Sequence, residues 1–104
     1  MSFLPGPDRL RRLLFYLIMA TRGGPVRGLI ISTLKEEPMN ANQLAQRLDL
    51  DYSTIKHHLD VLIENKLVEP AGSKYGQLYF ISSALLENYG EFLGMLGKIG
   101  KKQT

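Results

Sequence analysis

The chain has 104 residues, which gives room for one domain, residues 1–104, and no second globular unit. A hydrophobic share of 44% predicts a compact core, and the absence of cysteine excludes disulfides, thiolate metal sites and cysteine nucleophiles. The formal charge of +3 favours an anionic partner. The longest apolar run, Leu13–Ala20, is far shorter than the ~20 residues of a membrane span, so we expect a soluble cytoplasmic protein.

The first predicted helix covers residues 8–22, with Asp8 as its cap and two glycines, Gly23 and Gly24, at its end. Its interior, LLFYLIMA, is apolar on nearly every side, so most of its circumference must be buried. A subunit interface is the preferred explanation, and the core of a single chain is the alternative. Three basic residues near its start are interpreted mainly as a solvated face: Arg9, Arg11 and Arg12.

A second helix is predicted from Pro25, which suits the first turn of a helix, to about Glu36, before Pro38 stops it. Its role is chiefly structural. The residues expected to point inward are Val26, Leu29, Ile30 and Leu34.

A helix-turn-helix is predicted next, within NANQLAQRLDLDYSTIKHHLDVLIENKLV. Asn40 and Gln43 can form a capping box that starts a helix over residues 41–48. Asp51 can cap a longer helix over about 52–65. The apolar stripe of this longer helix consists of Ile55, Leu59 and Leu62, with His58 expected on the same side.

The outward face of the longer helix is polar, which suits a helix whose first turn enters the major groove of duplex DNA. Adjacent histidines project roughly 100° apart on a helix, so His57 and His58 are not expected to share a metal ion. We predict no metal site and no other cofactor. The residues of the motif expected to contact DNA are Asn42, Gln43, Tyr52, Ser53, Thr54, Lys56 and His57.

Two extended stretches follow, around the turn-rich tip AGSKYG, and they predict a two-stranded hairpin. At the tip, Lys74 and Tyr75 are expected to contact a phosphate or the minor groove, and a solvated turn is the competing interpretation. Alternation with a period of two separates Leu78 and Phe80 from Tyr79 and Ile81. The sequence does not show which pair faces inward.

The last predicted helix covers residues 83–100, with Ser82 or Ser83 as its cap. Apolar residues recur along it at steps of four and three, the spacing of a seam between two helices. A second stripe would let another helix approach closely: Gly90, Gly94, Gly97 and Gly100. We therefore expect a homodimer held by the first and last helices. The residues assigned to its interface are Leu13, Leu14, Leu17, Leu85, Tyr89, Phe92, Leu96 and Ile99.

The predicted fold is mainly α with a small β-hairpin, a winged helix-turn-helix with additional N- and C-terminal dimerisation helices. The segment LAQRLDLDYSTIKHHLDVLIENKLV, closed by YGQLYFIS, resembles the small archaeal members of the ArsR-like winged-helix regulators. The resemblance is best in NANQLA and DYSTIKHHLDVL, and it implies binding to duplex DNA as a dimer. Relatives with metal sites on the last helix use histidine and carboxylates there. Here that helix offers only Glu87 and Glu91, so metal sensing is not expected.

The distribution of charge argues against DNA. Residues 37–70, which contain the motif, have three Lys or Arg against six acids, whereas residues 1–36 have six against two. Neutralisation of phosphates supplies much of the affinity for DNA. The positive charge for this neutralisation could come from Lys74, Arg27 and the N-terminal arginines. The carboxylate of Asp51 is expected to cap a helix and so to repel phosphate less.

The leading hypothesis is a homodimeric, sequence-specific regulator that binds double-stranded DNA, with the helix at about 52–65 in the major groove and the wing at about 71–77 on the backbone or minor groove. The alternative is a winged-helix module that binds protein in a larger assembly, which the acidic motif favours. An enzyme is not expected, because the sequence has no phosphate-binding glycine loop and no histidine set beside a nucleophile.

Overall fold

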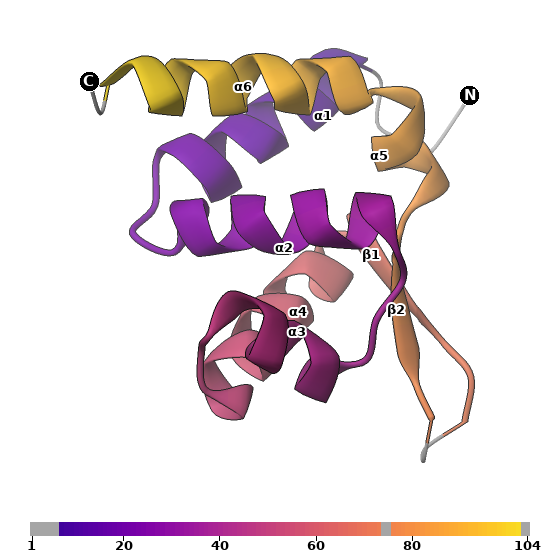
Figure 1. The fold of residues 1–104 in the computed structure, drawn as a ribbon. Coiled ribbons are helices and arrows are strands. Elements are labelled where there is room, and N and C mark those ends of the chain that lie inside the picture. Colours follow the sequence, from indigo (N-terminus) through magenta and orange to yellow (C-terminus); the bar gives the residue numbers. More distant parts are fainter. Residues whose placement is uncertain (1–6, 74–75, 103–104) are drawn as a thin grey trace.

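The computed structural model describes residues 7–73 and 76–102, with side chains for residues 8–73 and 76–98. Figure 1 shows stacked layers: α6 lies over α1, α2 crosses the middle, α3 and α4 lie below, and the hairpin runs along one side. The structure is mainly helical with one antiparallel hairpin, which confirms the predicted fold class. The elements are α1 (Pro7–Leu14), the π-helix η1 (Phe15–Met19), α2 (Gly24–Glu36), α3 (Ala41–Leu48), α4 (Tyr52–Glu64), β1 (Val68–Ala71), β2 (Leu78–Ile81), α5 (Ser83–Glu87) and α6 (Tyr89–Lys102).

The helix-turn-helix forms where the sequence predicts it. The Gln43 N–H donates to Asn40 Oδ1 and the Asn40 N–H donates to Gln43 Oε1, both at 2.8 Å, so the capping box is confirmed. α3 ends at Asp49, whose φ of 55° is left-handed, a conformation that aspartate tolerates better than most residues. The expected cap at the start of α4 is wrong: the Asp51 side chain makes no capping hydrogen bond.

The first helix differs from the regular helix that the sequence predicts. After α1 it continues as a π-helical turn, η1, which buries Leu17 and Ile18 and leaves Phe15 and Tyr16 exposed. The chain then reverses tightly into α2. A Cβ atom on Gly24 would collide with the carbonyl oxygen of Ile18, so glycine is required there by the close approach of α2 to η1.

The predicted C-terminal helix is divided in two. Ser82 Oγ accepts a hydrogen bond of 3.2 Å from the Leu85 N–H, which confirms the serine cap and starts α5. α5 ends at Asn88, whose side-chain amide donates to the Ala84 carbonyl at 2.9 Å. α6 then begins at Tyr89 and runs back over α1 and η1 (Figure 1).

The hairpin is antiparallel, with Val68 opposite Ile81. The Tyr79 N–H donates to the Met39 carbonyl at 2.9 Å, which ties β2 to the segment before α3. Tyr79 is 4% exposed and Ile81 is half-buried against the core, so this pair faces inward, the choice that the sequence leaves open.

One core connects all the layers. Leu29 was expected in it but is 53% exposed, because the buried face of α2 is formed by its neighbours instead. The largest fully buried side chains are Leu10, Leu14, Ile18, Ile30, Ile31, Leu44, Ile55, Leu59, Leu62, Leu67, Leu85 and Phe92.

Within the described part of the chain, no single helix has the length and apolar character to cross a membrane. Two consecutive helical segments, Asp8–Met19 and Gly24–Glu36, meet those criteria only together, and they are bent by 117° relative to each other.

Candidate nucleic-acid interface

The first two turns of α4 present polar side chains to solvent. Tyr52 is 51% exposed, Ser53 and His57 are also exposed, and Thr54 and Lys56 are half-buried. The packing of the opposite face of the helix fixes this orientation. The buried residues of that face are Ile55, His58, Leu59 and Leu62.

α3 contributes two of the predicted contact residues. Asn42 is exposed in its first turn. Gln43 is exposed as well, and its Oε1 accepts the capping bond from the Asn40 N–H. Gln43 therefore orders the start of α3, and its side-chain N–H groups can donate to a ligand.

A pocket of about 180 Å³ lies where α3, α4 and β2 meet. Lys56 Nζ donates to Tyr79 Oη at 3.4 Å, and this hydroxyl donates to Gln77 Oε1 at 3.4 Å. The hydrogen bond to Tyr79 raises the pKa of Lys56 despite the opposing effect of burial, so the ammonium group stays charged. The pocket is lined by Asn40, Ala41, Asn42, Tyr52, Lys56, Gly76, Gln77 and Tyr79.

Tyr79 and Gln77 are absent from the predicted contacts, although they complete this pocket. The signal in the sequence is the alternation along β2, which places Tyr79 on one of two faces but does not identify the inner one. Only the packing of the hairpin against α2 and α4 turns Tyr79 toward Lys56.

The negative charge of the helix-turn-helix, which argues against DNA binding, is also found close to the pocket. Asp60 Oδ1 lies 3.6 Å from Lys56 Nζ, so a carboxylate competes directly for the pocket's cation. Arg27 is only 6% exposed and is not available to a phosphate, which corrects one candidate source of positive charge. The N-terminal arginines lie on α1, and α2 separates that layer from α4 (Figure 1).

The two predicted wing contacts, Lys74 and Tyr75, lie outside the described residues. The two histidines of α4 point to different environments, as predicted. Their ring centroids are 5.2 Å apart in an edge-on arrangement, with His57 exposed and His58 buried. Across the described residues, no three His, Asp or Glu side chains converge on a possible metal position.

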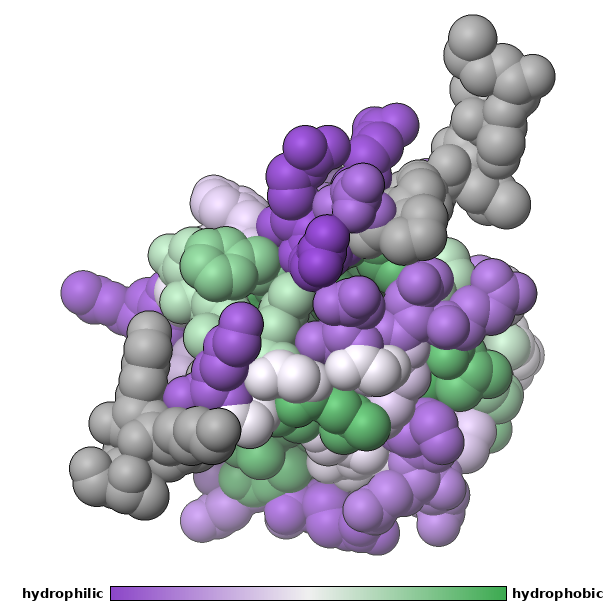
Figure 2. Space-filling view, turned by 90° about the horizontal axis from the view of Figure 1, so that it is seen from above, coloured by the Kyte–Doolittle hydropathy of each residue, from purple (hydrophilic) through white to green (hydrophobic). Residues whose placement is uncertain are grey.

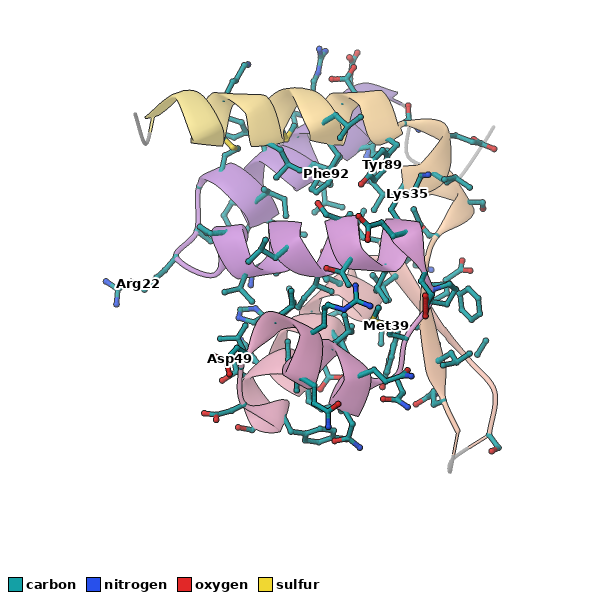
Figure 3. All side chains as sticks on the ribbon, viewed as in Figure 1. Arg22, Lys35, Met39, Asp49, Tyr89 and Phe92 are labelled. Atoms are coloured by element: carbon teal, nitrogen blue, oxygen red, sulfur yellow. The ribbon has the colours of Figure 1, made fainter. Side chains whose placement is uncertain are left out.

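Much of the predicted dimer seam is used inside the single chain, because α6 packs on α1 and η1. Phe92 and Tyr89 point from α6 toward α2, and Lys35 Nζ lies 5.4 Å from the centroid of the Tyr89 ring (Figure 3). The structure corrects the assignment of four residues that are at most 5% exposed and so cannot meet a partner: Leu14, Leu17, Leu85 and Phe92. Leu13, Tyr89 and Leu96 are partly buried against the same core, and the side chain of Ile99 lies outside the described residues.

A different apolar surface remains exposed on the outside of α6 and η1. Figure 2 looks onto this face and shows green apolar residues beside nearly white ones, with purple charged residues around them. Phe15 and Tyr16 of η1 and Leu93 of α6 are 53–60% exposed. A groove of about 200 Å³ between η1 and α6 is lined by Arg11, Phe15, Met19, Gly90, Glu91, Gly94, Met95 and Lys98.

Solved structures with this fold include several transcriptional regulators. HlyU from Vibrio cholerae N16961 has a TM-score of 0.63 and 22% identity, over 86% of this chain and 94% of that protein. An ArsR-like transcriptional regulator from Rhodococcus sp. RHA1 has a TM-score of 0.62 and 21% identity, over 92% of this chain and 85% of that protein. ZitR from Lactococcus lactis, solved in complex with DNA, has a TM-score of 0.52 and 17% identity, over 75% of this chain and 60% of that protein.

MarR from Staphylococcus aureus, solved with salicylate and kanamycin, has a TM-score of 0.61 and 20% identity over 73% of this chain, which spans about half (53%) of that protein. No curated protein sequence matches the chain. Residues 17–85 match the family described as methanogenesis regulatory protein FilR1, N-terminal domain. This match covers α2, the helix-turn-helix and the hairpin. The chain therefore belongs to the FilR1 N-terminal domain family, and it has the winged-helix fold of ArsR-like and MarR-like transcription regulators.

Proposed function

We propose that this protein is a transcription regulator that binds double-stranded DNA as a homodimer, with α4 in the major groove and the hairpin along the backbone or minor groove. The observation that carries the proposal is the pocket at the junction of α3, α4 and β2. There Lys56, Tyr79 and Asn42 bring a fixed cation, a hydroxyl and an amide together beside the exposed first turn of α4. A DNA backbone that passes this pocket would meet donors while α4 meets base edges.

The composition of the α4 surface supports DNA over a protein partner. A helix that docks into a groove of a partner protein presents a stripe of exposed apolar side chains. Among the described residues, Tyr52 is the one large apolar side chain on α4 that is strongly exposed, and it carries a hydroxyl group. The ZitR structure provides a second support, because a protein of the same fold is bound to DNA in it.

The homodimer is proposed to use the exposed face of η1 and α6 rather than the predicted seam. Phe15 and Tyr16 project from the π-helical turn, and Leu93 projects from α6 beside the glycines. A Cβ atom on Gly90 or Gly94 would meet nothing within 4 Å in the single chain, so the glycines are not explained by packing inside one subunit. Burial of this face in a dimer would leave both α4 helices free.

The test is titration of the purified protein into a random-sequence duplex at low and moderate salt, with the molecular mass recorded at the same concentrations. Binding by a dimer, falling with salt, is the expected result, and it would justify selection of a specific site. No binding at low salt would reject the proposal and would make a protein partner of the acidic motif the better explanation.

A further inference from the structure

Arg27 lies inside the fold and joins three elements. Arg27 is 6% exposed, and its Nε donates to the Leu17 carbonyl in η1 at 3.1 Å. Its Nη2 donates to Thr21 Oγ1, after η1, and its Nη1 lies 3.1 Å from Nδ1 of His58 on α4. One guanidinium group thus fastens the end of the N-terminal helix to the buried side of α4.

The contact with His58 fixes the protonation state of the imidazole. Arginine carries only donors, so His58 Nδ1 must accept, and the neutral ring then holds its proton on Nε2. A second proton would lie on Nδ1 and point at a cation. The charged or titratable groups that act on His58 are Arg27 from α2 and His57 from α4 itself. Neither ion pair among the described residues, Asp8 with Arg11 or Lys56 with Asp60, includes Arg27 or His58.

Arg27 has little freedom to move away from a protonated His58. Leu17 O lies in the last turn of η1, where carbonyl groups lack helical partners and carry partial negative charge. Gly23 closes the other side: a Cβ atom there would lie 2.7 Å from both Arg27 Nη1 and His58 Cε1. Burial, together with the Arg27 and His57 charges, accordingly lowers the pKa of His58.

We propose that Arg27 and His58 are positioning residues that hold α4 against the end of η1 only while His58 is neutral, so that acidification releases α4 and weakens DNA binding. His58 is buried on the core side of α4, whereas Tyr52 and His57 are exposed, so His58 acts on DNA through the orientation of the helix. The effect on DNA rests on the proposed function, whereas the state of the His58 contact does not.

The contact is tested first without DNA, by nitrogen NMR of the two imidazoles across a pH titration of the intact protein. His58 is expected to show the Nε2–H tautomer at neutral pH and to titrate below the ordinary histidine pKa of about 6.5. Gly23→Ala should push the pair apart and move the titration of His58 toward that ordinary value. A proton on Nδ1 at neutral pH, or titration of His58 at or above the ordinary value, would overturn the proposal.

The effect on DNA is tested in a His57→Asn background, which removes the exposed histidine. In that protein, binding to a short random-sequence duplex at constant salt should weaken on acidification, by at most about tenfold per pH unit for each subunit, because each subunit carries one such proton. Adding His58→Asn should flatten the profile, because the Asn Oδ1 can accept from Arg27 and cannot titrate. Equal pH profiles with and without His58→Asn would overturn the coupling. Absence of duplex binding by the unaltered protein at every pH would reject the proposed function instead, while the NMR result stands by itself.

Discussion

Lys56 is the cation at the centre of the pocket between α4 and the hairpin, and its hydrogen bond to Tyr79 keeps it there. We expect Lys56→Ala to weaken duplex binding and to lower the salt dependence by about one released counterion per subunit, with the dimer intact. Titrations over a range of salt concentrations measure both quantities. Arg12→Ala, which removes an equal charge from exposed α1, is the matched control and should change binding much less. Equal losses for the two variants would remove Lys56 from the contact surface.

Asp60 opposes the attraction of Lys56 for phosphate, because its Oδ1 lies 3.6 Å from Lys56 Nζ and carries a negative charge. Asp60→Asn is expected to strengthen duplex binding at low salt, since it frees the ammonium group and removes a charge that repels phosphate. The gain should shrink as salt rises, because exposed charges are screened. Glu64→Gln, one turn further along α4, is the control. If both variants gain equally, overall charge rather than the Lys56 pair sets the affinity.

Among the elements, α6 has two apolar faces with different tasks. Phe92 is fully buried in the single chain, whereas its neighbour Leu93 is 53% exposed. Phe92→Ala should therefore lower the free energy of unfolding by about 3–5 kcal/mol, which thermal or urea unfolding measures. Leu93→Asp should leave the fold intact but yield a monomer, which light scattering measures. A Leu93→Asp protein that remains a stable dimer would show that the interface lies elsewhere.

For the whole molecule, one titratable group reports on the packing of the terminal helices against α2. Burial raises the pKa of Tyr89, with Glu36 adding to the shift and a hydrogen bond to Ser32 opposing it. The stability linked to this proton is therefore fully present below the ordinary tyrosine pKa, about 10, and is lost as pH rises beyond it. Thermal unfolding across that range should show a steeper alkaline loss for the native protein than for Tyr89→Phe. Parallel curves would mean that the pKa of Tyr89 is the same in the folded and the unfolded protein.

The order and bounds of the central elements follow from the sequence by itself. The capping box at Asn40 and Gln43, the stripe of Ile55, Leu59 and Leu62, and the serine cap after the hairpin are local signals, each settled by residues a few positions apart. The core-side position of His58 follows in the same way from helical spacing.

The tertiary structure decided every question that depended on which surfaces meet. The sequence shows that α6 and the first helix each have an apolar face. It could not show that these two faces pack against each other in one chain and leave Phe15 and Leu93 exposed. For the same reason it offered Arg27 as a free cation, whereas packing surrounds it with η1 and α4. Periodicity defines the faces of an element, and only the contacts between elements select the partner of each face.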